Sequence, residues 1–201
     1  GKKQVNKSVI NKTLGLMKNR GPDYQDWRSF TANNTNVYLL HSRLSIIDLD
    51  ERSNQPFSFN GATLVFNGEI YNYIEVRQEL KKQGHVFSTD SDTEVLLKAY
   101  VEYGEDCVKY FNGMWAFAIW DERNKKLFLS RDRFAEKPLY YFQDNDGFYF
   151  ASEIKAIQSL LQKKLQINYD HLKRYLVYGY KFLNKTPQTY FHGIREIEFA
   201  S

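Results

Sequence analysis

A small group of polar side chains follows or interrupts apolar segments of this 201-residue chain, at places where packing alone does not require them. The group contains one cation, one amide, one glycine and two carboxylates, namely Arg43, Asn67, Gly68, Glu69 and Asp92. An arginine can bind a carboxylate through two parallel hydrogen bonds, and acidic side chains can hold an ammonium group. The combination therefore suits a free amino acid as ligand.

Asn67 and Gly68 also suggest catalysis. An amide side chain next to a glycine N–H can form an oxyanion hole, in which each donor is worth about 10²–10³ in rate. Each residue also has a purely structural interpretation. Asp92 could cap a helix, Arg43 could form an ion pair, and the Asn67–Gly68 pair could be a turn. From the residue chemistry alone these alternatives stay open.

The elements that must position these residues follow from apolar periodicity. Amphipathic spacing predicts helices over 5–18, 70–83, 95–103, 153–161 and 169–178, and short apolar runs predict strands over 37–40, 44–47, 64–66, 114–120, 127–130, 139–142 and 148–151. Ser91 and Glu94 have the spacing of a capping box, and Gly84 and Gly104 are placed to end helices. Hairpin-length turns and helices grouped in blocks predict an α+β sandwich with antiparallel sheets, formed by a single domain.

Composition narrows the function classes. No apolar run approaches the roughly 20 residues of a membrane span, and the net charge of +4 comes from scattered basic residues, so we expect neither a membrane nor a nucleic acid as partner.

The single cysteine, Cys107, has no basic neighbour and is predicted to be a buried, inert thiol. One cysteine fits a reducing compartment, and the cytoplasm is the expected location. The four histidines are isolated, so no metal site is expected.

At these residues the sequence resembles the glutaminase domain of asparagine synthetase, a class II glutamine amidotransferase with an N-terminal-nucleophile fold. The resemblance runs through nearly the whole chain. It is carried by segments 20–23, 43–48, 55–56, 66–72, 91–94, 112–113, 117–118, 131–133, 137–141 and 151–156. A smaller departure is Ala135, where the family usually has glycine. If that position needs a positive φ, alanine costs about 1 kcal/mol.

The resemblance implies a four-layer αββα sandwich of two antiparallel sheets, and it assigns a role to each polar residue. Arg43, with the backbone of Ile46 and Ile47, would hold the glutamine carboxylate and its surroundings. Glu69 and Asp92 would hold the α-ammonium group. Asn67 and the Gly68 N–H would form the oxyanion hole. The loop 20–23 is expected near the pocket without a catalytic role.

In this family the nucleophile is an N-terminal cysteine whose own α-amine acts as the base. The present sequence begins with Gly1, so the short first strand that carries this cysteine is expected to be missing, and the chain as it stands is expected to be inactive. Cys107 cannot replace the nucleophile because it lacks a free amine. A trimmed active enzyme is favoured over a domain that has lost hydrolysis, because the other site residues are intact.

The expected ligand is L-glutamine. The resemblance also implies an ATP-dependent synthetase domain after Ser201, with ATP and Mg²⁺ bound there and no cofactor in this chain. A homodimer is left open. The alternatives are a regulatory pseudo-domain that binds glutamine without hydrolysing it, and an amidotransferase for a sugar or another acceptor that is not aspartate.

Overall fold

The protein was analysed as a computed structural model that describes residues 1, 4–179 and 188–198. The helices are α1 (Lys7–Met17), α2 (Tyr73–Lys82), α3 (Asp92–Tyr103), α4 (Ile154–Leu161) and α5 (Tyr169–Tyr178), with short 3-10 turns η1 (Glu51–Ser53) and η2 (Gly104–Tyr110). The strands are β1 (Tyr24–Ala32), β2 (Thr35–Arg43), β3 (Phe57–Phe59), β4 (Ala62–Ile70), β5 (Gly113–Asp121), β6 (Lys126–Arg131), β7 (Tyr140–Gln143), β8 (Phe148–Ala151) and β9 (Arg195–Glu196).

The central layer is an antiparallel sheet in the order β3-β4-β5-β6. The sequences of its middle strands, β4 and β5, are nearly continuous apolar runs. Such sequences are expected for strands that are covered on both faces. On one face α2 and α3 cover residues such as Leu64, Phe66 and Phe117, which are at most 5% exposed. On the other face Val65, Ala118 and Trp120 pack against Leu39 of β2. Burying apolar area on both faces is the main stabilising contribution to such a layer.

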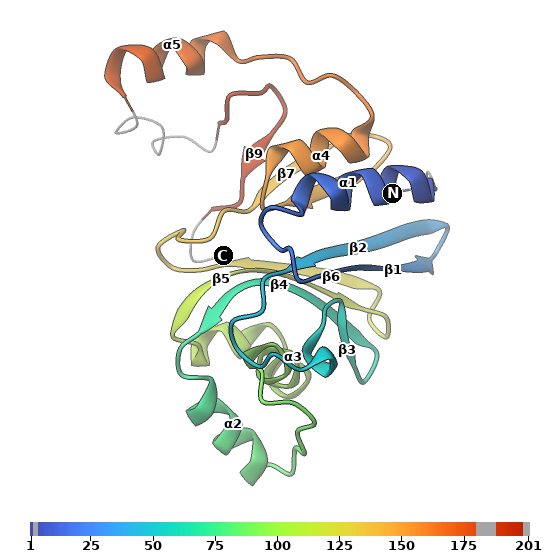
Figure 1. The fold of residues 1–201 in the computed structure, drawn as a ribbon, viewed down its shortest axis with the longest axis vertical. Coiled ribbons are helices and arrows are strands. Elements are labelled where there is room, and N and C mark those ends of the chain that lie inside the picture. The colour runs from blue at the N-terminus through green and yellow to red at the C-terminus, as the bar shows by residue number, and fades with distance from the viewer. Residues whose placement is uncertain (2–3, 180–187, 199–201) are drawn as a thin grey trace.

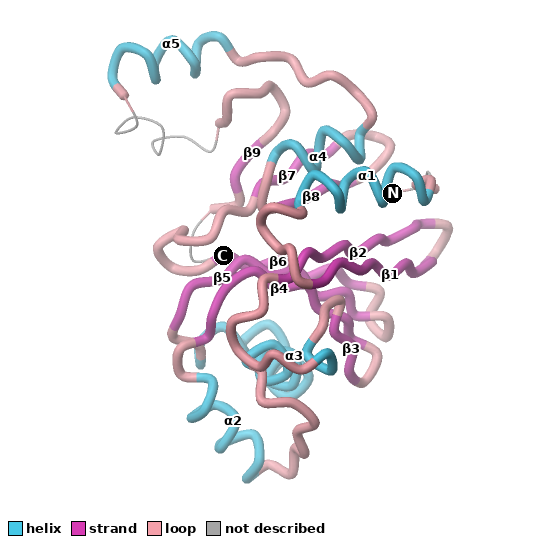
Figure 2. The backbone as a smooth tube through the Cα atoms, viewed as in Figure 1, coloured by secondary structure: helices cyan, strands magenta, loops and turns pink. Residues whose placement is uncertain are grey.

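Four layers are visible in Figure 1. Helices α1 and α4 form one outer layer, and α2 and α3 form the other. Between them lie the central sheet and a second layer that contains β1, β2, β7, β8 and β9 (Figure 2). The predicted αββα sandwich is therefore confirmed.

The second layer is divided, which the sequence did not indicate. In the described part of the chain it consists of a β1-β2 hairpin and a separate sheet in the order β8-β7-β9. No ladder joins β2 to β8 among these residues. The two pieces flank a groove that bears on the candidate site.

The strand predicted over 44–47 is wrong. Strand β2 ends at Arg43, and the next residues form a loop in which Leu44 is 55% exposed and Ile46 is 62% exposed. The Arg43 guanidinium binds the carbonyl groups of Ile47 and Asp48, and these hydrogen bonds fold the loop back toward the end of β2. Strand β1 was not predicted, because Ala32 is its only buried residue and its sequence is mostly polar.

Most local signals are confirmed. The Ser91 hydroxyl accepts a hydrogen bond from the Glu94 N–H at the start of α3, and Gly84 and Gly104 have positive φ where their helices end. Ala135 has a φ of 57°, the left-handed conformation that the family's glycine implies. Helix α2 begins three residues later than predicted, because Ile70 still belongs to β4. Among the described residues, none of the helices has the length and apolar character that a membrane span requires.

Candidate active site

Strand β4 has one edge that is paired along its whole length and one that is not. The paired edge lies against β5, and the Tyr71 N–H just beyond β4 still donates to Asn112 on that side. Backbone groups alternate between the two edges of a strand. Phe66, Gly68 and Ile70 therefore direct their N–H and C=O groups to the other edge. Strand β3 pairs with residues 62–64 only, so it does not reach this part of the edge.

Side chains bind the part of the β4 edge that β3 does not reach. The Phe66 N–H donates to Gln55 Oε1 at 2.6 Å, and the Ile70 N–H donates to Asp92 Oδ2 at 3.0 Å. Between them lies the Gly68 N–H, which points to the same edge by the alternation. An N–H fixed in this way is pre-organised to stabilise an oxyanion.

Position 68 requires glycine because no side chain fits there, and not because the backbone needs a positive φ. A Cβ atom built at Gly68 would lie 2.2 Å from the Met114 carbonyl oxygen on β5. Any larger residue would push the two central strands apart at this point. The glycine therefore allows the candidate donor to sit inside an unbroken ladder.

Asn67, the other predicted donor, has its side chain on the groove side of the sheet. Its Nδ2 donates to Ser152 Oγ, just after β8, at 3.3 Å. Asn67, Gly68, Glu69 and Asp92 all line the same cavity. The structure thus brings together residues that the sequence singled out in two separate segments, 67–69 and Asp92.

Asp92 lies in the first turn of α3 and is only 5% exposed. Burial raises the pKa of its carboxyl group to about 6, although the N–H groups of Ile70 and Thr93 oppose the shift, and the nearby charge of Glu69 adds to it. A carboxylate that burial leaves short of compensating charge is suited to bind a cation. Its position next to Glu69 fits the predicted ammonium site.

Arg43 is 6% exposed and lies at the end of β2, in the wall of the cavity. Its Nη1 donates to Asn54 Oδ1 at 2.7 Å and to the Asp50 carbonyl at 3.2 Å. Its Nη2 donates to the carbonyl groups of Ile47, at 3.4 Å, and Asp48. Arg43 therefore organises the loop that carries Ile46 and Ile47, and all three residues line the cavity.

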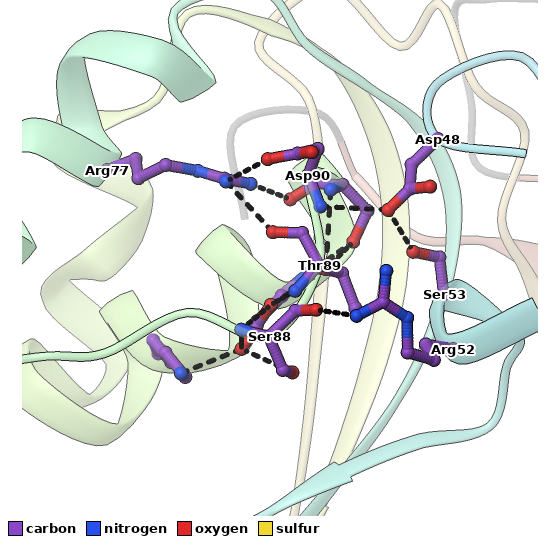
Figure 3. A network of polar contacts seen from close by, with 10 residues as sticks. Asp48, Arg52, Ser53, Arg77, Ser88, Thr89 and Asp90 are labelled. Carbon is purple, nitrogen blue, oxygen red and sulfur yellow. Dashed lines mark hydrogen bonds and ion pairs between the residues drawn. The ribbon is translucent and has the colours of Figure 1, made fainter. Parts of the chain in front are cut away.

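A polar network joins this loop to the segment that precedes Asp92 (Figure 3). Asp48 Oδ2 accepts hydrogen bonds from the Ser53 hydroxyl at 2.6 Å and from the Asp90 N–H at 2.8 Å.

Two arginines bind carbonyl groups of the same segment. Arg52 donates to the Ser88 carbonyl, and Arg77 donates to the carbonyl groups of Thr89 and Ser91. The network holds two separate parts of the site in register.

The cavity has a volume of about 700 Å³ and continues as a groove between β2 and β8, over the central sheet. Gly1 lies at the far end of this groove. Its amino group donates to the Asn36 carbonyl at 2.9 Å, and its carbonyl accepts from the Asn36 N–H at 2.7 Å. This reciprocal pair has the hydrogen-bond pattern of one rung of an antiparallel ladder alongside β2.

Two residues at the site were not predicted to act there. Gln55 was noted only as part of a family motif, and its role is invisible in the sequence because its partner Phe66 is eleven residues away. His41 was interpreted as an isolated histidine. Its Nε2–H donates to the Phe66 carbonyl at 3.0 Å, and Nδ1 has no partner among the described residues. Burial lowers the pKa of His41 to about 4, so the ring is neutral at neutral pH.

Cys107 is fully buried in η2, among the core residues between α3 and the central sheet. Burial raises the pKa of its thiol to about 12. The predicted burial of this thiol is confirmed. The loop 20–23 also lies where expected, because Arg20 lines the cavity and Asp23 accepts a hydrogen bond from the Ser45 N–H.

Comparison with known proteins agrees with this geometry. The model of the glutamine amidotransferase domain matches residues 1–201. The chain belongs to the glutamine amidotransferase domain family. A putative asparagine synthetase [glutamine-hydrolyzing] 2 of Methanocaldococcus jannaschii is 39% identical over 196 residues, which cover 89% of this chain and 38% of the relative. Asparagine synthetase [glutamine-hydrolyzing] 3 of Bacillus subtilis is 38% identical over 206 residues, covering 99% of this chain and 32% of the relative.

The amidotransferase domain spans about a third of the length of these relatives. Among solved structures, the glutamine phosphoribosylpyrophosphate amidotransferase of B. subtilis superposes with a TM-score of 0.61 at 21% identity, covering 76% of this chain and 40% of that one. At this identity the likeness concerns the fold alone, and it agrees with the αββα sandwich that the resemblance implied.

Proposed function

We propose that this domain binds L-glutamine at the end of the groove and releases ammonia from its side-chain amide. The observation that carries the proposal is the free edge of β4, where the Gly68 N–H lies between two clamped neighbours and next to Asn67. Asp92 and Glu69 bind the α-ammonium group of glutamine. Arg43, with the loop that holds Ile46 and Ile47, binds its carboxylate.

The nucleophile in this proposal is an N-terminal cysteine on a strand that precedes Gly1. Such a strand continues the rung between Gly1 and Asn36 along β2, in the antiparallel direction. From Asn36 to Arg43 this path spans seven residue steps, or about 23 Å at 3.3 Å per residue. It ends beside Arg43 and the cavity that contains Asn67. A chain without that strand binds glutamine weakly and does not hydrolyse it.

The reaction proceeds in two steps. The cysteine thiolate attacks the side-chain amide carbon of glutamine, and the negative charge that develops on the oxygen is stabilised by Asn67 and the Gly68 N–H. The α-amine, with an ordinary pKa near 7.7–8.0, takes the thiol proton and passes it to the leaving nitrogen. Ammonia departs, and water hydrolyses the resulting thioester to glutamate.

The ammonia is consumed by a separate synthetase domain in the same protein, which binds ATP and Mg²⁺ and amidates aspartate. Relatives about three times as long, named as glutamine-hydrolysing asparagine synthetases, support this assignment. In the proposal, residues 1–201 form one amidotransferase domain, require no cofactor of their own, and work in the cytoplasm.

The test uses the full-length protein from its natural start. It is incubated with a diazo-ketone analogue of glutamine, and its intact mass is compared before and after treatment. One adduct, together with glutamate release from glutamine, is the expected result. Absence of both an adduct and glutamate release would contradict glutaminase activity, and retained glutamine binding would then favour a regulatory domain.

A further inference from the structure

The unpaired edge of β4 raises the question of what keeps the oxyanion donors in place. Past residue 64 none of the described strands pairs with this edge. A strand edge without a partner is free to shift by fractions of an ångström. Misplacement of a catalytic group by about 1 Å can reduce a rate about 100-fold. Residues that restrain this edge therefore matter for catalysis even when they do not touch the substrate.

The peptide groups on both sides of Phe66 are held by side chains. The Gln55 carboxamide oxygen accepts the Phe66 N–H at 2.6 Å, and the His41 ring donates to the Phe66 carbonyl at 3.0 Å. The Phe66 carbonyl belongs to the same peptide plane as the Asn67 N–H, and Gly68 follows directly. The two contacts thus fix the chain direction immediately before both candidate donors.

Gln55 has the geometry of a rigid clamp. It is 6% exposed, and its Nε2 donates to Thr93 Oγ1 at 3.3 Å, in the first turn of α3. Thr93 follows Asp92, which holds the Ile70 N–H. Both ends of the 66–70 edge are therefore tied to the start of the same helix, and the Gly68 N–H is left between the two ties.

We propose that Gln55 is a positioning residue for the oxyanion hole: its carboxamide oxygen, by holding the Phe66 N–H, fixes the direction in which Asn67 and Gly68 present their donors. This inference rests on the proposed glutaminase function. It distinguishes Gln55 from Arg43, Glu69 and Asp92, whose task is to bind glutamine. Loss of the Gln55 clamp should weaken transition-state stabilisation and leave ground-state binding nearly unchanged.

The experiment compares three variants in the full-length protein. Gln55→Met keeps the length of the side chain and removes the acceptor oxygen, Gln55→Glu keeps an acceptor at the same reach, and Thr93→Val removes only the second contact. For Gln55→Met we expect kcat to fall about 10- to 100-fold with KM within about threefold of the parent value. Gln55→Glu should recover most of the kcat, and Thr93→Val, which leaves the acceptor oxygen of Gln55 in place and removes only its anchor, should lower kcat less than Gln55→Met does.

Stability is controlled with Ile157→Val, a change at a fully buried residue of α4, away from β4. This variant should lower the melting temperature without changing kcat. A Gln55→Met enzyme with the parent kcat would overturn the proposal. A raised KM with unchanged kcat would overturn it as well, because Gln55 would then act by contacting glutamine.

A second readout separates this inference from the proposed function. If the full-length parent releases no glutamate, the proposed function fails. Hydrogen–deuterium exchange over the peptide 64–70 then tests whether the Gln55 oxygen restrains this edge of β4. Faster exchange in Gln55→Met than in Gln55→Glu supports it. Equal exchange in the two variants overturns it.

Discussion

Asp92 and Glu94 lie two residues apart in the first turn of α3, and both are at most 5% exposed, yet their surroundings are opposite. Glu94 forms an ion pair with Lys98 at 2.7 Å and accepts hydrogen bonds from Ser88 and Thr89. Burial alone would raise the pKa of Glu94, but these partners outweigh it and hold the pKa below its usual value. Asp92 has no cationic partner among the described residues, and burial raises its pKa to about 6.

The difference separates a structural carboxylate from a binding carboxylate. Glu94 is fully compensated within the protein and has no capacity left for a ligand. Asp92 is held by backbone N–H groups on the wall of the cavity, and its charge is compensated only when a cation arrives. One turn of one helix thus contributes both to the stability of the fold and to recognition.

The largest expected effect is on the structural side of this comparison. Glu94→Gln leaves the Lys98 ammonium buried without its counter-ion, and breaking such a pair costs about 3–5 kcal/mol. Urea unfolding of the full-length protein measures the loss. Adding Lys98→Met to Glu94→Gln should restore part of the stability, and glutamine kinetics should stay near the parent in both. A loss of glutamine recognition equal to that of Asp92→Asn would break the comparison.

The second-largest effect is a gain in stability, on replacing Asp92. The folded-state pKa of Asp92, about 6, lies above its unfolded value of 3.8, so ionised Asp92 destabilises the fold at high pH. Asp92→Asn should therefore stabilise the protein above pH 6, by up to about 3 kcal/mol. The gain should shrink as the pH falls from 6 to 4, where the folded parent becomes protonated. Urea unfolding at pH 5 and pH 8 provides the test, and a loss of stability at pH 8 would contradict it.

Glutamine recognition should depend on the same proton. Asp92 must be ionised to hold an ammonium group, so the apparent Kd for glutamine should rise about tenfold per pH unit below pH 6, or about 1.4 kcal/mol per unit. Calorimetric titration of the full-length protein between pH 5 and pH 8 measures this dependence. If glutamine affinity showed no inflection near pH 6, the assignment of Asp92 as the cation site would be wrong.

The smallest effect concerns Ser91, the helix cap that precedes both carboxylates. Ser91→Ala removes the hydroxyl that accepts the Glu94 N–H and should cost about 1 kcal/mol of stability. Ser91→Thr keeps the acceptor and serves as the control. Thermal unfolding measures both variants, and glutamine affinity should stay within about twofold of the parent, because Asp92 keeps its bond to Ile70.

Much of this arrangement could be predicted from the sequence. The helical periodicity and the Ser91 cap locate α3, and the unusual polar positions point to Asn67 and Asp92. The roles of Gln55 and His41 could not be found in this way. Each contacts Phe66 across a turn or between layers, and no local spacing encodes such a contact. Strand β1 was missed because its exposed faces lack apolar alternation.

The most direct test of the account is the effect of glutamine on the melting temperature of the full-length protein and of its Asp92→Asn variant. A ligand that binds the native state stabilises it in proportion to its occupancy. Saturating glutamine should raise the melting temperature of the parent and leave that of Asp92→Asn unchanged. An equal rise in both proteins would contradict the claim that this carboxylate recognises glutamine.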